Sequence, residues 1–228
     1  MIGLSTLLVL VALGALCALD TVSVLQAMVS RPIVSATLAA ATLGRAEDGV
    51  VIGVVLELFA IETMPFGASR YPEWGSAGVV AATMYLIGGS GTSGSLAIAT
   101  LAGLATALLG SMSMVRHRQV VARIAATLRD QIAAGSASAV SRLHAAGIVS
   151  DFWRGVVVTA IGLAVALLVG RRVLAAWYLP FGPSAAWPFI LGVAAAAASI
   201  VRSVRAVPRA SWFLIGGTVI GIGLVFAR

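Results

Sequence analysis

The amino-acid sequence predicts an all-α integral membrane protein with multi-pass helices, some of them short re-entrant hairpins or broken helices. The first observation is composition: 60% of the 228 residues are hydrophobic, only 10% are charged, and the mean hydropathy is +1.06. A soluble domain carries about 25% charged residues, so this chain could not cover its surface in water. The second observation is a series of apolar runs along the whole chain, several interrupted by proline, glycine or charge. Lipid is therefore the expected solvent, and residues 1–228 are predicted to form a single membrane-embedded domain.

The apolar runs differ in length, and this difference predicts the architecture. They fall near residues 2–19, 32–43, 49–61, 76–88, 94–115, 155–170, 186–201 and 211–227. A full crossing needs about 20 apolar residues, which the second, third and fourth runs do not reach. Short runs of this kind survive at membrane depth only where protein or a water-filled cavity surrounds them. Transporters place their substrate sites at such discontinuous helices.

The first run is expected to be a retained helix rather than a signal peptide, because MIGLSTLLVLVALGALCALD has no basic n-region. It contains Cys17, the one cysteine, which cannot form an internal disulfide and is expected to pack. We expect residues 1–115 to hold the N-terminal helices and the re-entrant core. Residues 116–150 should form a cytoplasmic amphipathic segment, and residues 151–228 the C-terminal helices.

The basic residues number 15, all of them arginines, and the net charge is +7. Nucleic-acid binding is not expected, because no basic stripe with interleaved aromatic residues occurs. Arginines that flank apolar runs instead set topology, with the basic loops in the cytoplasm. This rule places residues 116–142 and 202–209 on the cytoplasmic side. The Arg171–Arg172 pair leaves two alternatives open: it is periplasmic, or the run 155–170 does not cross fully.

The segment 116–150 is polar and rich in arginine, and its pattern is helical. Val120, Ile124, Leu128 and Ile132 recur every fourth residue. This spacing predicts an amphipathic helix that lies on the membrane or on a partner.

Three carboxylates stand in apolar surroundings: Asp20, Glu57 and Glu62. A charge in the bilayer core costs about 2.5–3.5 kcal/mol, so such residues usually face a cavity or a partner. Asp20 could equally be an interfacial helix end. Glu57 lies deep in its run, GVVIGVVLELFAIETMPFGAS, which favours a site or a buried ion pair. Glu62 lies about 140° further around a continuous helix, so the two glutamates would not share a face.

Uncharged and basic polar groups precede the second run. Pro32 is expected at the first position of a helix, and Arg31 either snorkels to the interface or is the counter-ion of Asp20 or Glu57. Gln26 and Ser30 lie just before it and could bind sugar hydroxyls. Neither His117 nor His144 has a Cys, His or carboxylate at metal-ligand spacing, so no metal is predicted. No phosphate-binding glycine loop occurs either, and no cofactor or enzymatic chemistry of its own is expected.

The order of these motifs resembles that of a known family. The stretch LDTVSVLQAMVSRPIV, the stretch LGRAEDGVVIGVVLELFAIETMPFGAS, and then Pro72 and Glu73 are similar to the enzyme IIC membrane subunit of mannose/fructose/sorbose-type phosphotransferase systems. A later element, RLHAAGIVSDFWRG, matches the family's His, Gly, Phe, Arg and Gly positions at His144, Gly147, Phe152, Arg154 and Gly155. The resemblance runs from about residue 10 to about residue 225. Glu73 replaces the usual Asp, and Glu62 falls where relatives have a small or apolar residue.

The resemblance implies a sugar permease subunit of the bacterial inner membrane. It implies a IID membrane partner, a larger oligomer, and an elevator-like motion of a core built from re-entrant hairpins. Soluble IIA and IIB components would phosphorylate the hexose or amino sugar. The implied substrate-binding residues are Gln26, Ser30, Arg31, Glu57, Gly67, Pro72 and Glu73, with supporting polar roles for Asp20, His144 and Arg154. Glu62 is also expected to be a supporting polar residue, but the resemblance assigns it no role.

Two alternatives stay open at this point. The chain could be a non-transporting regulatory or scaffold subunit that recruits phosphotransfer proteins. It could also be an ion- or proton-coupled transporter that uses Glu57 or Glu62.

Overall fold

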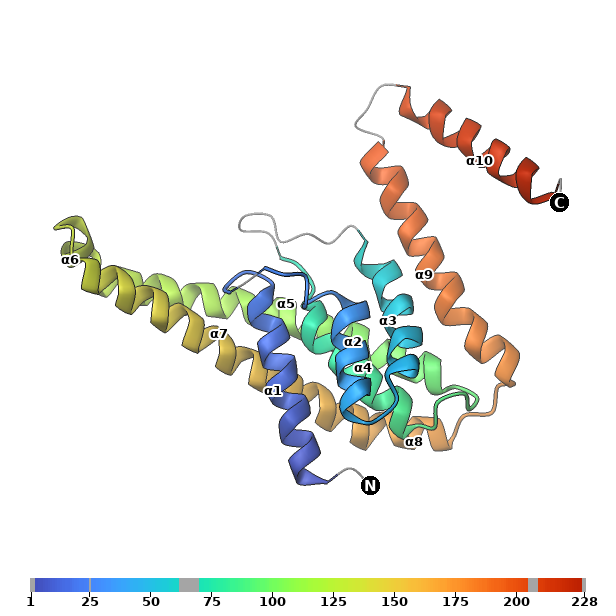
Figure 1. The fold of residues 1–228 in the computed structure, drawn as a ribbon, viewed down its shortest axis with the longest axis horizontal. Coiled ribbons are helices and arrows are strands. Elements are labelled where there is room, and N and C mark those ends of the chain that lie inside the picture. Colours follow the sequence, from blue (N-terminus) through green and yellow to red (C-terminus); the bar gives the residue numbers. More distant parts are fainter. Residues whose placement is uncertain (1–2, 25, 62–69, 205–208, 227–228) are drawn as a thin grey trace.

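In the described residues, every regular element is helical (Figure 1). The structure is a computed structural model and describes residues 3–24, 26–61, 70–204 and 209–226. The first helices are α1 (Leu4–Asp20), α2 (Pro32–Thr42), α3 (Ala46–Ala60), α4 (Trp74–Ile87) and α5 (Ser95–Thr127). They are followed by α6 (Arg129–Ala133), α7 (Ala137–Val165), the π-helical stretch η1 (Ala166–Gly170), α8 (Arg171–Ala175), α9 (Phe181–Val204) and α10 (Ala210–Phe226).

Helices α2, α3 and α4 are too short to cross a bilayer, as the sequence predicted. They have 11, 15 and 14 residues. At 1.5 Å per residue, the longest spans about 23 Å, against a hydrocarbon core of about 30 Å. Helices α2 and α3 form a hairpin joined by a short turn at Gly44, whose φ of 71° suits glycine. Pro32 begins α2 at its first position, as predicted.

Small residues bring α2 and α3 unusually close together. A Cβ atom on Gly49 would lie 2.6 Å from the Ala36 carbonyl oxygen, and one on Gly53 would lie 2.8 Å from the Ile33 Cα atom. Side chains at either position would push the helices apart, whereas glycine lets the backbones approach. Because Gly49, Gly53 and Glu57 are spaced by four residues, all three lie on one face of α3, which packs on α2.

Helix α4 is the centre of the molecule. Its residues from Trp74 to Tyr85 are all buried, and it packs against α1, α2, α3, α5 and α7. A helix that is apolar on every side is stable only when other helices surround it. Its small residues allow this packing; Gly75, for example, faces the backbone of Cys17 on α1. The thiol of Cys17 is buried, in agreement with the predicted packing role.

Three of the described helices are long and apolar enough to cross a membrane: Ser95–Thr127, Ala137–Ala175 and Phe181–Arg202. The second is a continuous helix of 39 residues that includes η1 and α8. It runs about 58 Å at 1.5 Å per residue, longer than a bilayer core. Arg171 and Arg172 therefore lie at the opposite end of this helix from the basic segment, which favours the alternative in which the run crosses fully.

The basic segment 116–150 is helical but is not a separate amphipathic helix. Residues 116–127 continue α5 without a break, residues 137–150 begin α7, and α6 forms the turn between them. No proline or glycine interrupts the chain at 115–116, so the apolar helix extends into the polar sequence. In Figure 1, α5 and α7 form a long antiparallel hairpin whose tip projects away from the other helices. Ile124, Leu128 and Ile132 are half-buried, whereas Val120 is exposed.

Candidate functional site

Asp20 ends α1 and organises the loop that follows it. The residue is only 4% exposed. Its Oδ1 atom accepts a hydrogen bond of 2.7 Å from the Ala27 backbone N–H, and Oδ2 accepts one of 2.9 Å from the Ser30 N–H. Carboxylates satisfied by backbone donors are among the stronger hydrogen-bonded groups in proteins. Asp20 is therefore a helix end, as one reading of the sequence had it, but a buried one that shapes the loop.

The backbone of this loop is strained, so the loop depends on the hydrogen bonds that Asp20 accepts. Gln26 and Met28 have φ values of 52° and 63°, in the left-handed region that non-glycine residues rarely adopt. Each such residue costs about 1–2 kcal/mol. Strained conformations of this kind persist only where the surroundings fix them, and they cluster at ligand-binding sites.

Arg31 and Glu57 form the second part of the site. Arg31 Nε donates a hydrogen bond of 2.6 Å to Glu57 Oε1, and Arg31 Nη2 contacts the same oxygen. Glu57 Oε2 accepts a hydrogen bond of 3.2 Å from the backbone N–H of Ile33, in the first turn of α2. The side chains are 29% and 23% exposed, so the pair is partly open. Of the two counter-ions considered for Arg31, the structure selects Glu57.

Two further predicted residues lie beside this pair with unused polar groups. Gln26 is exposed, and its side-chain amide makes one weak hydrogen bond, 3.5 Å to the Val22 carbonyl. Ser30 is half-buried, and in the described part of the chain its hydroxyl makes no hydrogen bond. The loop before α2 and the last turn of α3 thus supply four of the predicted substrate-binding residues: Gln26, Ser30, Arg31 and Glu57. Glu62 and Gly67, also predicted for the site, lie outside the described residues.

A second polar cluster is buried between α4, α5 and α7. Arg154 Nη1 lies 3.1 Å from Glu73 Oε2, and Arg154 Nε donates a hydrogen bond of 2.7 Å to Asp151 Oδ1. Glu73 is 1% exposed and Asp151 is fully buried. Arg154 also donates to the hydroxyl of Ser113, at 3.1 Å. Removing one partner from a buried ion pair is strongly destabilising, because the remaining charge loses its compensation.

Glu73 is therefore fully engaged in structure. It is the N-cap of α4, where its Oε1 atom accepts hydrogen bonds from the Ser76 N–H at 3.1 Å and the Ser76 hydroxyl at 2.9 Å. Acidic groups at this position stabilise the positive end of the helix. Pro72, half-buried, directly precedes this cap. Both were predicted to bind substrate; the contacts of Glu73 join it to Arg154 rather than to the Arg31–Glu57 pair.

Asp151 and Ser23 were not singled out from the sequence, yet they connect the two clusters. The Ser23 hydroxyl donates a short hydrogen bond to Asp151 Oδ2. The loop after α1 is thus anchored in two ways: its N–H groups donate to Asp20, and its Ser23 hydroxyl donates to Asp151 on α7. The i, i+3 spacing of Asp151 and Arg154 on a helix was a visible signal of their pairing. The contact with Ser23, 128 residues away along the chain, had no signal in the sequence.

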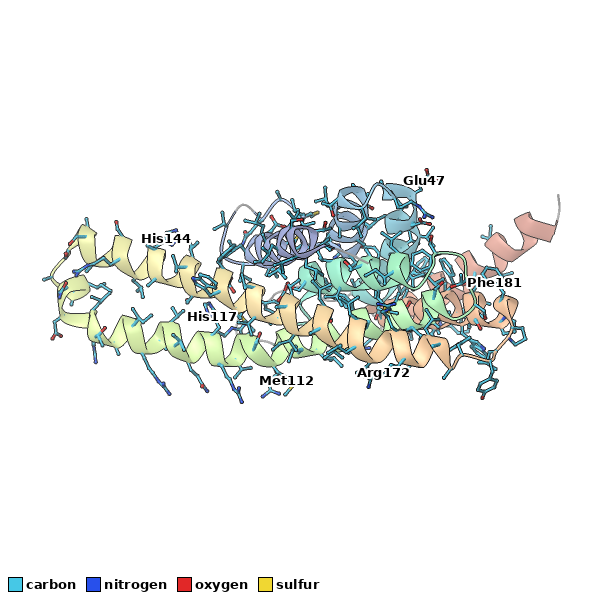
Figure 2. The ribbon with its side chains drawn as sticks, turned by 90° about the horizontal axis from the view of Figure 1, so that it is seen from below. Glu47, Met112, His117, His144, Arg172 and Phe181 are labelled. Carbon is cyan, nitrogen blue, oxygen red and sulfur yellow. The ribbon has the colours of Figure 1, made fainter. Side chains whose placement is uncertain are left out.

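His144, predicted as a supporting polar residue, is not part of either cluster. It is exposed on α7, towards the tip of the long hairpin (Figure 2). His117 is half-buried, with its Nδ1 atom 3.5 Å from the Ser150 hydroxyl. In the described ranges, no three His, Cys, Asp or Glu side chains gather closely enough to hold a metal ion.

These features define an all-helical membrane protein of the transporter type, in which a short hairpin with a partly open ion pair packs on the buried helix α4. Residues 4–181 match the family model of the sorbose-specific IIC component of the phosphotransferase system. The chain belongs to this family of sugar permease subunits, as the ordered motifs indicated.

Two solved structures share the fold. One is the mannose transporter ManYZ in complex with microcin E492, with a TM-score of 0.62 and 20% identity over 99% of this chain and 94% of that chain. The other is described as a membrane protein and has a TM-score of 0.69 and 19% identity over 100% of this chain and 94% of that chain. The comparison with curated proteins gives no match.

Proposed function

We propose that this chain is the sugar-translocating IIC subunit of a mannose-type phosphotransferase system in the bacterial inner membrane. It binds a hexose or amino sugar together with a IID membrane partner and delivers the sugar to IIA and IIB components for phosphorylation. The observation that carries the proposal is the Arg31–Glu57 pair beside the loop that Asp20 fixes.

The chemistry of this group suits a neutral polyol. Gln26 and Ser30 offer both donors and acceptors, and the partly open guanidinium and carboxylate add more of each. Sugar hydroxyls are themselves donors and acceptors, so they can bond to such a mixed set. Because Arg31 neutralises Glu57, the pair has no net charge with which to attract a cation. This argues against an ion-coupled transporter that uses Glu57.

The hairpin geometry suits the elevator-like motion that the family resemblance implied. Helices α2 and α3 are joined through glycine contacts and through the ion pair, so they can move as one unit. Neither helix spans the bilayer, so polar groups near the ends of the hairpin can lie at membrane depth, where a surrounding protein shields them. Helix α4, which Glu73 caps, packs on both α2 and α3 and would support this unit.

The partner assignment rests on the family and on the shared fold. The solved relative is a complex named ManYZ. In this chain, exposed apolar side chains such as Leu101, Leu108 and Met112 need lipid or a partner subunit to cover them.

The test is equilibrium binding of radiolabelled sugars to the full chain co-purified with its membrane partner. Mannose, fructose, sorbose and glucosamine are the probes, and a non-hydroxylated cyclohexane is the negative control. Saturable binding of at least one sugar is expected. If the folded complex binds none of them but still recruits IIA or IIB proteins, the permease role is wrong and the regulatory alternative holds.

A further inference from the structure

A partly open cavity of about 500 Å³ lies between α5 and α7, on the long hairpin. Polar and cationic side chains line one level of it: Ser113, Arg116, His117, Ser150 and Arg154. The remaining lining is apolar, with Leu109, Met112 and Val157 among it. None of the Arg31–Glu57 group lines this cavity, so it is separate from the proposed sugar site.

A second, apolar cavity of about 280 Å³ continues along the same two helices. It is lined by small and aliphatic residues, including Ala102, Ala105, Gly162 and Val165. Leu109 lines both cavities, so they lie next to each other along α5 and α7, and we treat them as one groove. From residue 102 to residue 113 the groove follows α5 for about 17 Å, close to the thickness of one bilayer leaflet, about 15 Å.

The part of the groove that Arg116 and His117 line lies where the apolar part of α5 ends. Residues 95–115 are apolar and span about 31 Å, the thickness of a hydrocarbon core. Arg116 and His117 follow directly. Trp153, 60% exposed, lines the groove at the same level. Tryptophan and arginine are enriched where a membrane helix meets the headgroups.

The charges at this level are not all compensated. Arg116 is exposed and has no ion-pair partner within the described ranges. The guanidinium of Arg154 is held by Glu73 and Asp151, yet its Nη2 atom is buried and makes no hydrogen bond to any described residue. Figure 2 shows His117 on the side of α5 that faces α7. The groove therefore joins a cationic, donor-rich end to an apolar channel.

We propose that this groove binds an anionic phospholipid. The phosphate lies at Arg116, where the His117 ring offers a further hydrogen bond. One acyl chain follows the apolar groove past Leu109 towards Gly162. A lipid fits because a cationic end joined to an apolar channel of one leaflet's length matches an amphiphile, whereas a sugar would leave the channel unfilled.

The test is photo-crosslinking of the full chain in nanodiscs that contain equal amounts of phosphatidylglycerol and phosphatidylcholine with matched acyl chains. A benzoylphenylalanine replaces Val157, which lines the groove and is 53% exposed, so the fold should tolerate it. Mass spectrometry then identifies the adduct. We expect mostly the phosphatidylglycerol adduct.

Two charge variants decide whether the headgroup is recognised at this place. Arg116→Gln removes an exposed cation that lines the groove, and Arg123→Gln removes an exposed cation two turns further along α5. A basic residue near the membrane surface changes the affinity for an anionic lipid about fivefold. Arg116→Gln should lower the preference for phosphatidylglycerol by about that factor, and Arg123→Gln should leave it unchanged.

Four outcomes would overturn the proposal. Equal adducts with both lipids, or equal effects of the two charge variants, would mean that only general charge attraction acts. An adduct with a polypeptide would mean that a protein helix covers the groove. Absence of any lipid adduct, while the complex still binds sugar, would dismiss the lipid site and leave the permease role intact.

Discussion

Arg31 and Glu57 pair across the α2–α3 hairpin, with Arg31 Nε 2.6 Å from the Glu57 carboxylate. The contact joins the loop after α1 to the last turn of α3, because Arg31 directly precedes α2. The same carboxylate accepts the Ile33 N–H, so Glu57 also satisfies a free donor in the first turn of α2. One side chain thus closes the hairpin and presents a polar surface beside Gln26 and Ser30.

Glu57→Gln should abolish sugar uptake while membrane insertion stays intact. The amide cannot balance the charge of Arg31, and a hydrogen bond to a charged group contributes about 1.5–3 kcal/mol. We expect sugar affinity to fall about tenfold or more. Glu47→Gln is the matched control, since Glu47 is exposed at the start of the same helix (Figure 2). Uptake of every tested hexose by the Glu57→Gln complex would show that this carboxylate has no role in transport.

Gly53→Ala should loosen the hairpin. The added Cβ would lie 2.8 Å from the Ile33 Cα atom, so α2 must shift away from α3. Overpacking of this kind costs about 1–3 kcal/mol. Gly147→Ala is the control, because a Cβ there meets nothing within 4 Å; in a helix it should stabilise by about 0.5–1 kcal/mol. Thermal unfolding in detergent compares the two, and equal melting temperatures would rule out a required close approach.

Asp20→Ala should release the loop that carries Gln26 and Ser30. The N–H groups of Ala27 and Ser30 lose their acceptor, and a hydrogen bond to a charged group contributes about 1.5–3 kcal/mol. Hydrogen exchange of residues 26–30 should become faster, and sugar affinity should fall. Asp20→Asn, which retains one carbonyl oxygen, should have a smaller effect. Unchanged exchange in both variants would show that the loop does not depend on Asp20.

Asp151→Ala should destabilise the protein by about 3–5 kcal/mol, because Arg154 loses a buried partner. Ser23→Ala should cost about 1 kcal/mol. Since the two side chains are hydrogen-bonded, the double variant should lose less than the sum, with a coupling of about 0.5–3 kcal/mol. Denaturant unfolding of the four proteins gives this coupling; if Asp151→Ala does not fold, Asp151→Asn takes its place. Strict additivity would argue that α7 does not hold the loop.

Much of the fold could be predicted because hydropathy is a local property. The runs at 32–43, 49–61 and 76–88 are indeed helices shorter than a bilayer core. The long hairpin was not predicted in full: the change from apolar to polar sequence at residue 116 marks the membrane boundary but does not end the helix. A helix ends where backbone hydrogen bonding is broken, and alanine and arginine do not break it.

The candidate site was predicted in part. The sequence pointed to Glu57 because an isolated carboxylate in an apolar run needs a partner, and it named Arg31 as one option. It also placed Glu73 among the substrate-binding residues, which stays a prediction; the structure adds that Glu73 caps α4 and pairs with Arg154. The family motif marks both glutamates equally, and only the structure shows that Glu73 is buried and Glu57 partly exposed.

The sequence by itself determined the class of protein, the family, the short helices and the need of each apolar-run carboxylate for a partner. These follow from composition, order of motifs and the cost of burying charge. Only the tertiary structure decided which partner each carboxylate takes: Arg31 for Glu57, backbone N–H groups for Asp20, and Arg154 for Glu73 and Asp151. That choice depends on how closely helices approach, as Gly49 and Gly53 permit, and on contacts such as Ser23–Asp151 between residues far apart along the chain.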